Sequence, residues 1–104
     1  MKRGEVWWAD FPSPVGKRPV LLLSRNRAIE VRASVIVAQI TRTVRAIPTE
    51  VPLGPEDGLP KACVVNADVL MTIPKANLLA RVCALSNDKL RAAERAVRFA
   101  LALR

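Results

Sequence analysis

The 104-residue chain contains no histidine, so any acid–base chemistry must run without the side chain that most often carries a proton near neutral pH. It has only two cysteines, Cys63 and Cys83, in apolar surroundings and without Cys-x-x-Cys spacing. A structural zinc site needs about four such ligands. We therefore expect no metal site and two buried, reduced cysteines, with a disulfide possible but not required.

Long apolar runs are also missing. No stretch approaches the roughly 20 residues of a membrane-spanning helix. The charged segment Met1–Glu5 is not followed by the apolar block of a signal peptide. These absences predict a cytoplasmic protein with no membrane segment. The apolar content of 51% is enough for a core, and the length predicts a single domain over residues 1–104.

Acidic side chains are few relative to basic ones. Nine Asp and Glu residues face 17 Lys and Arg residues, which gives a formal net charge of +8. A small, strongly basic domain suits a polyanion or an acidic partner protein. The same charge also raises solubility, so composition alone leaves both explanations open.

Short apolar segments separated by turn residues predict a mainly β fold. The expected strands are residues 5–11, 19–24, 34–41, 49–53, 62–66, 68–73 and 80–85, with a short helical turn possible over 25–32. In the first strand, Trp7 and Trp8 are neighbours and face opposite sides of the sheet. We expect one tryptophan inside the core and the other half exposed.

The carboxy-terminal segment predicts an amphipathic helix. Ser86 is a suitable N-cap, and apolar residues follow at helical spacing at Leu90, Ala93, Val97 and Leu101. Many short strands followed by one helix indicate a small, partly closed antiparallel barrel capped by that helix.

Three polar residues stand beside the predicted central strands and could act on a phosphodiester. In RNA the 2′-hydroxyl is already placed beside the phosphorus, so the protein must mainly stabilise charge. Arg18 can bind two phosphate oxygens, Thr41 offers a hydroxyl, and Asp68 is the nearest candidate base. Each also has an ordinary explanation: a solvated or ion-paired arginine, a strand threonine, and an aspartate that satisfies turn amides.

Ordered sequence blocks carry a family resemblance over nearly the whole chain. The blocks are Arg3–Phe11, Lys17–Val20, Thr41–Arg45, Glu50–Leu53, Gly58–Pro60 and Val64–Asn66. In their order and spacing they resemble the MazF/PemK-like toxins of bacterial toxin–antitoxin pairs.

The resemblance implies an SH3-like (PemK/CcdB-type) small β-barrel that forms a homodimer. It also implies a sequence-selective endoribonuclease that needs neither metal nor cofactor. The expected substrate is single-stranded RNA (mRNA, or alternatively tRNA or rRNA), cut to a 2′,3′-cyclic phosphate and a 5′-hydroxyl. A cognate antitoxin with an acidic, partly disordered segment is the expected inhibitor.

The resemblance also assigns roles to residues. The family's catalytic arginine and threonine fall on Arg18 and Thr41. The candidate RNA-binding residues are Lys17, Arg42, Arg45, Asn66 and Asp68, and an exposed tryptophan could stack a base.

Two other functions remain open. Toxins with this barrel that act on DNA gyrase need no ribonuclease site. A non-catalytic barrel that binds RNA or protein would keep the basic surface without the chemistry.

Overall fold

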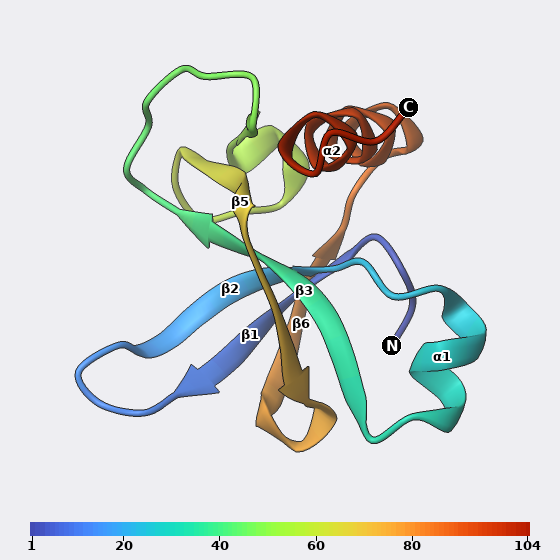
Figure 1. The fold of residues 1–104 in the computed structure, drawn as a ribbon. Helices are drawn as coiled ribbons and strands as arrows, with labels where there is room; N and C mark the ends of the chain where they lie inside the picture. Colours follow the sequence, from blue (N-terminus) through green and yellow to red (C-terminus); the bar gives the residue numbers. More distant parts are fainter.

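Six antiparallel strands curl into a half-barrel in the computed structural model, which describes residues 1–104 (Figure 1). The strands are β1 (Glu5–Phe11), β2 (Gly16–Leu22), β3 (Ser34–Thr41), β4 (Glu50–Leu53), β5 (Cys63–Pro74) and β6 (Leu78–Ala84). The helices are α1 (Asn26–Val31) and α2 (Asn87–Ala100), with single 3₁₀ turns at Pro55–Asp57 and Lys75–Asn77. The sheet order is β4-β5-β3-β2-β1-β6. The predicted antiparallel barrel with a terminal helix is confirmed.

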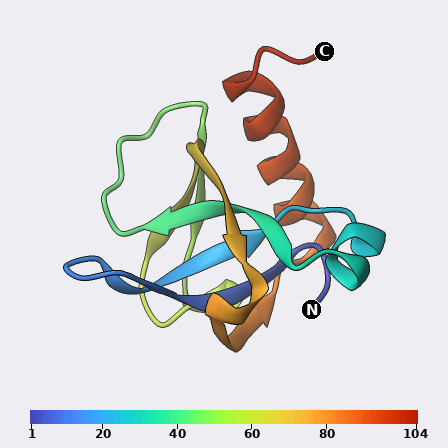
Figure 2. The same cartoon turned by 60° about the horizontal axis from the view of Figure 1, so that its bottom comes forward.

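The curled sheet buries apolar side chains on both faces. One cluster includes Val6, Leu21 and Ile40 and extends to Ala93 and Ala96 of α2, which packs against β4 and β5. The other cluster includes Val20 and Val37 on the opposite face, where α1 lies against β3. Figure 2 shows the two helices at separate places beside the sheet. Alternation along each strand accounts for the two clusters, because successive side chains point to opposite faces.

Helix α2 begins where the sequence predicts. The Ser86 hydroxyl accepts a hydrogen bond from the backbone N–H of Lys89 at 3.2 Å, which satisfies one free amide of the first turn. Asp88 places a negative charge in the same turn. The helix ends at Ala100, so Leu101 lies just beyond it.

The largest differences from the predicted strand limits are in β2 and β5, while β4 and β6 differ from their predicted limits by one or two residues at an end. β2 starts at Gly16 rather than at Pro19, because its hairpin pairing with β1 continues through Arg18 to Gly16. The two strands predicted over 62–73 form one strand, β5. Ala38 and Gln39 of β3 pair with Leu70 and Asn66, so the ladder skips three residues of β5 there. The Asn66 side chain accepts the N–H of Asp68 at 3.0 Å, which satisfies an amide at this irregularity.

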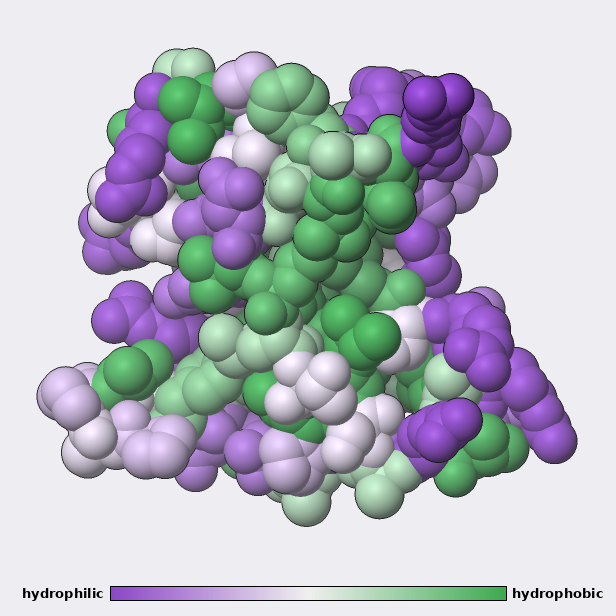
Figure 3. Space-filling view, in the orientation of Figure 1, coloured by the Kyte–Doolittle hydropathy of each residue, from purple (hydrophilic) through white to green (hydrophobic).

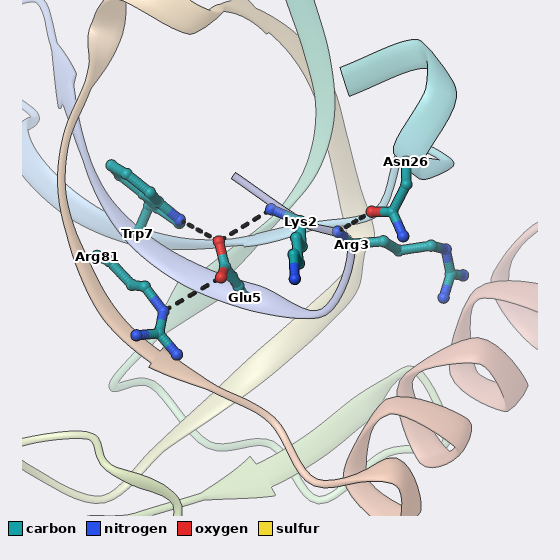
Figure 4. A network of polar contacts seen from close by, with 6 residues as sticks. All are labelled: Lys2, Arg3, Glu5, Trp7, Asn26 and Arg81. Atoms are coloured by element: carbon teal, nitrogen blue, oxygen red, sulfur yellow. Dashed lines mark hydrogen bonds and ion pairs between the residues drawn. The ribbon is translucent and has the colours of Figure 1, made fainter. Parts of the chain in front are cut away.

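Glu5 anchors the start of the chain to β6, as Figure 4 shows. Its carboxylate accepts hydrogen bonds from the Trp7 indole at 3.0 Å and the Lys2 amide at 2.9 Å, and it pairs with Arg81 at 3.2 Å. Burial by itself would raise the pKa of Glu5, but the hydrogen bonds from Trp7 and Lys2 and the Arg81 charge hold the pKa below its usual value. The charged form is therefore the one that the fold stabilises.

Both cysteines are free thiols, as expected. Cys63 is buried in the larger apolar cluster and Cys83 packs against that cluster. Burial raises the pKa of each thiol, and the nearby Asp57 carboxylate raises it further. The thiols are thus protonated at neutral pH and weakly reactive. Neither helix of the fold is long and apolar enough to cross a membrane.

Candidate functional site

A pocket of about 290 Å³ opens between the start of β2, the end of β3 and the segment that precedes β5. The lining residues are Trp8, Lys17, Arg18, Pro19, Ile40, Thr41, Arg42, Leu59, Pro60, Lys61 and Cys63. Four residues predicted from the sequence therefore share one pocket: Lys17, Arg18, Thr41 and Arg42.

Strand register explains why Arg18 and Thr41 lie together. β2 pairs with β3 only from Val20, which faces Gln39, to Leu22. Arg18 and Thr41 are not paired with each other, but they lie two residues beyond the last β2–β3 pair, one on each strand. Positions two residues apart on a strand share a face, so both side chains lie on the face of Val20 and Gln39 and line the same pocket. β1 supports Arg18 from its other side through the pairing of Ala9 with Arg18.

The Thr41 hydroxyl is oriented by the chain that follows it. Its oxygen accepts a hydrogen bond from the backbone N–H of Thr43 at 3.2 Å. A hydroxyl has one proton to donate and two acceptor positions. No protein acceptor takes the proton of Thr41, so the hydroxyl is free to donate it to a ligand in the pocket.

The pocket gathers four cations: Lys17, Arg18, Arg42 and Lys61. None of them is in a salt bridge, because the ion pairs of the fold involve other basic residues. No carboxylate lines the pocket either. Four cations unpaired around one concavity produce a positive potential that attracts and orients an anion.

Lys61 was not among the predicted site residues. The sequence marks Gly58–Pro60 as a turn, but it does not show in which direction the turn sends the chain. In the structure the turn returns Leu59, Pro60 and Lys61 to the ends of β2 and β3. A cation directly after a Gly/Pro turn was the available signal.

The other predicted residues lie outside the pocket lining. Asp68 accepts a hydrogen bond from the Thr49 hydroxyl at 2.7 Å, and Asn66 accepts the Asp68 amide. The Arg45 backbone N–H donates to Glu50, and its side chain is solvent-exposed. Asp68 is thus occupied in local structure and is not placed beside Arg18. A role for these three in RNA binding stays a prediction.

Glu50 holds the loop that carries Arg42 and Arg45. One carboxylate oxygen accepts the N–H groups of Arg45 and Ala46 at 2.8 and 2.9 Å. Ala46 has a φ of 54°, which is a left-handed backbone conformation that is unfavourable for alanine. The two hydrogen bonds therefore hold the loop in a conformation that it would not adopt alone.

Replacing Glu50 with alanine should lower the free energy of unfolding by about 1–2 kcal/mol, because two exposed loop amides lose a charged acceptor. Urea denaturation measures the change. Glu50→Gln keeps an oxygen acceptor at the same position and is the matched control, with a smaller loss expected. Equal stability of the wild type and the alanine variant would show that the loop does not depend on this carboxylate.

Comparison with known proteins shows which family the chain resembles. The model of the "PemK-like, MazF-like toxin of type II toxin-antitoxin system" matches residues 2–101. The probable endoribonuclease MazF5 of Mycobacterium tuberculosis is 38% identical over 91 residues, which are 86% of this chain and 83% of that protein. The name endoribonuclease agrees with the enzymatic activity expected from the sequence.

Solved structures extend the likeness to the whole fold. A mycobacterial endoribonuclease in complex with its cognate antitoxin superposes with a TM-score of 0.89 at 32% identity, covering 100% of this chain and 97% of that one. The Mycobacterium tuberculosis toxin MazF-mt6 gives 0.88 at 33% identity, covering 96% and 98%. The barrel expected from the resemblance is therefore confirmed. Because the family model spans nearly all of the sequence, this chain belongs to the PemK-like, MazF-like toxins of type II toxin–antitoxin systems.

Proposed function

We propose that the protein is an endoribonuclease toxin that cuts single-stranded RNA at Arg18 and Thr41. The observation that supports the proposal is that Arg18 and Thr41 line one pocket together with three further unpaired cations. Such a pocket fits a phosphodiester, and the hydroxyl and guanidinium contact different oxygens of it. Relatives named endoribonuclease match most of the chain, which supports the same activity here.

The reaction needs no external nucleophile. The ribose 2′-oxygen attacks the adjacent phosphorus, the bond from phosphorus to the 5′-oxygen of the next nucleotide breaks, and a 2′,3′-cyclic phosphate forms. The 2′-hydroxyl loses its proton, and the departing 5′-oxygen gains one. Arg18 stabilises the extra negative charge on the phosphorane-like transition state through paired N–H donors. Thr41 donates its free proton to a phosphate oxygen, while Lys17, Arg42 and Lys61 hold flanking phosphates.

The purified protein should cut single-stranded RNA in the presence of excess EDTA. The products should carry a 2′,3′-cyclic phosphate and a 5′-hydroxyl, which end-specific ligation and sequencing identify. Sequencing of the 5′-hydroxyl ends also gives the cleavage motif. Cleavage that requires added magnesium would contradict the proposal. Binding of RNA with steep salt dependence but no cyclic product would favour the non-catalytic barrel, and inhibition of supercoiling without RNA cleavage would favour the gyrase poison.

The expected inhibitor is an antitoxin with an acidic, partly disordered segment. The unpaired cations of the pocket and the net charge of +8 favour such a segment, which pays its ordering entropy only on binding. A mycobacterial relative of similar fold is in complex with its cognate antitoxin. We infer that the same pocket receives both the RNA and the antitoxin, so that the two compete.

An apolar groove between the sheet and α2 supports the expected homodimer. It has a volume of about 290 Å³ and is lined by Leu23, Ile36, Leu70, Val97 and Leu101 with Arg3, Glu94 and Arg98. Ile36 and Leu101 are 47% and 52% exposed. Figure 3 shows apolar surface over the crossing of β3 and β5 and up beside α2. A continuous exposed apolar face of this kind suits a two-fold contact with a second copy.

Replacing Ile36 with aspartate should convert the proposed dimer to a folded monomer, because each copy would bring an unpaired carboxylate into the apolar contact. Light scattering after size exclusion gives the mass, and circular dichroism checks the fold. Val15→Asp is the control, since Val15 is 45% exposed on the β1–β2 turn and away from this groove. An unchanged mass for Ile36→Asp would place the dimer contact elsewhere.

A further inference from the structure

A second pocket, of about 340 Å³, lies beside the first and shares two residues with it. Its lining consists of Trp8, Lys17, Leu79 and Ala80. Trp8 and Lys17 also line the pocket that holds Arg18 and Thr41. The two pockets are therefore separated by a single tryptophan and a single lysine. A strand of RNA with a phosphate at Arg18 would meet Trp8 on leaving the first pocket.

An irregularity in β6 builds this second pocket. Trp8 of β1 pairs with Ala80, but the next residue, Ala9, pairs with Leu78. Leu79 is thus an extra residue without a partner across the ladder, which is a β-bulge. Bulges redirect a side chain and occur often beside functional sites. The redirected Leu79 is 47% exposed, and it forms one wall of the pocket that contains Trp8.

The two tryptophans make different contacts. The Trp7 indole N–H donates to Glu5 at 3.0 Å, and its ring packs against the smaller apolar cluster. Both tryptophans are half-buried, so the expectation that one of them lies inside the core is wrong. The Trp8 indole N–H differs from that of Trp7 in having no acceptor in the protein. The fold therefore accounts for Trp7 as a structural residue. It leaves the Trp8 ring in the lining of both pockets and the indole N–H free for a ligand.

We propose that the second pocket is a nucleobase subsite in which Trp8 stacks one base next to the scissile phosphate, with Leu79 on the other wall. The proposal rests on the endoribonuclease function and makes Trp8 a residue that determines specificity. A planar base suits an aromatic ring facing an aliphatic side chain, and stacking accepts any base, so selectivity comes from the free indole N–H and the space available. Lys17 lies between the two pockets and neutralises the phosphate that joins them.

The lining favours a base over an acidic peptide. An acidic segment would need several cations, whereas Lys17 is the only charged residue among the four. An apolar wall facing an aromatic ring leaves carboxylates without partners. Binding of the antitoxin in this pocket is instead an outcome that the experiments below detect.

Fluorescence separates the two tryptophans, because the chain contains no others. Trp7→Phe leaves Trp8 as the reporter, and Trp8→Phe leaves Trp7. The probe is a short RNA that contains the site cut by the wild type, with a 2′-deoxy sugar at the scissile position to prevent cleavage. We expect quenching of Trp8 and little change at Trp7. Binding detected by fluorescence anisotropy without any quenching of Trp8 would overturn the proposal.

Kinetics with abasic substrates test the stacking itself. In the wild type, removal of the base at one position beside the cut should lower kcat/KM about 10- to 100-fold. The Trp8→Ala variant should cut the normal substrate with a kcat/KM reduced by a similar factor. Removing the base from the substrate should lower the kcat/KM of this variant little further, because the tryptophan on which the base stacks is already absent. If the effects of Trp8→Ala and of base removal on kcat/KM were independent at every substrate position, no base would be stacked on Trp8.

Leu79→Asp tests the same pocket without removing a core residue, because Leu79 is 47% exposed and belongs to neither apolar cluster. A carboxylate there should repel the RNA and raise KM, with melting temperature unchanged. If Trp8→Ala and Leu79→Asp cut RNA like the wild type but escape the antitoxin, the pocket receives the peptide and the proposal is wrong. Absence of RNA cleavage by the wild type would overturn the endoribonuclease function itself. Cleavage by the wild type with unaltered cleavage by the variants would overturn only the base subsite.

Discussion

Arg18→Ala should cut RNA about 10²–10³-fold more slowly than the wild type in kcat, the usual cost of removing one preorganised donor to a developing oxyanion. Arg18 is exposed on β2, without an ion pair or a hydrogen bond to another side chain. Its removal therefore leaves the fold and the melting temperature unchanged. The measurement is single-turnover cleavage of an oligonucleotide that contains the mapped site, in excess EDTA.

Arg18→Lys is the matched control, because it keeps the positive charge and loses the planar, paired donors. We expect its rate to lie between those of the wild type and the alanine variant, with RNA affinity nearly preserved. Lys61→Ala should instead weaken RNA binding and reduce the dependence of that binding on salt concentration, because Lys61 is proposed to contact a flanking phosphate. Its effect on kcat should be smaller than that of Arg18→Ala. Full activity of Arg18→Ala would remove the residue from the reaction.

The sheet could be predicted from the sequence because its strands follow a simple rule. Val20–Leu22 and Val35–Val37 are nearly continuous apolar runs, and the structure buries all of these residues except Ile36 in the two clusters on the faces of the sheet. The helix was marked at its start by Ser86 and along its length by Leu90, Ala93 and Val97. Strand ends were less predictable, since pairing extends β2 back to Gly16 through contacts with β1 that no local pattern encodes.

The candidate site was only partly predictable. The resemblance named Arg18 and Thr41, and in the structure both residues line one pocket at neighbouring strand ends. Lys61 and Leu79 were missed because a turn and a bulge decide where their side chains go. Both devices depend on backbone geometry over several residues and on pairing with distant strands. Residue type alone does not reveal them.

Gly58 sets the direction of the turn that returns Lys61 to the pocket. Its φ is +102°, a left-handed conformation, and its N–H donates to the Pro55 carbonyl at 3.1 Å. A Cβ at this position would lie 2.7 Å from the Cβ of Cys83. The turn has little room to shift, because Asp57 accepts the Gly54 amide at 3.0 Å and lies 3.8 Å from the Lys89 ammonium on α2.

Gly58→Ala should therefore lower the free energy of unfolding by about 2–5 kcal/mol. About 1–2 kcal/mol comes from the left-handed backbone, and about 1–3 kcal/mol from the overlap with Cys83. Denaturation in urea measures the loss. RNA cleavage should fall as well, because Leu59, Pro60 and Lys61 would be displaced from the pocket lining.

Gly16→Ala separates these two costs. Gly16 also has a positive φ, of +69°, but no atom lies within 4 Å of the position that its Cβ would take. Its alanine variant should lose only the backbone share, so the difference between the two variants measures the steric overlap. Cys83→Gly removes the opposing Cβ, and the double variant with Gly58→Ala should be less destabilised than the sum of the two single changes. Equal losses at Gly58 and Gly16, with additive effects at Cys83, would show that the turn yields to the added methyl group and that contact with β6 does not fix its direction.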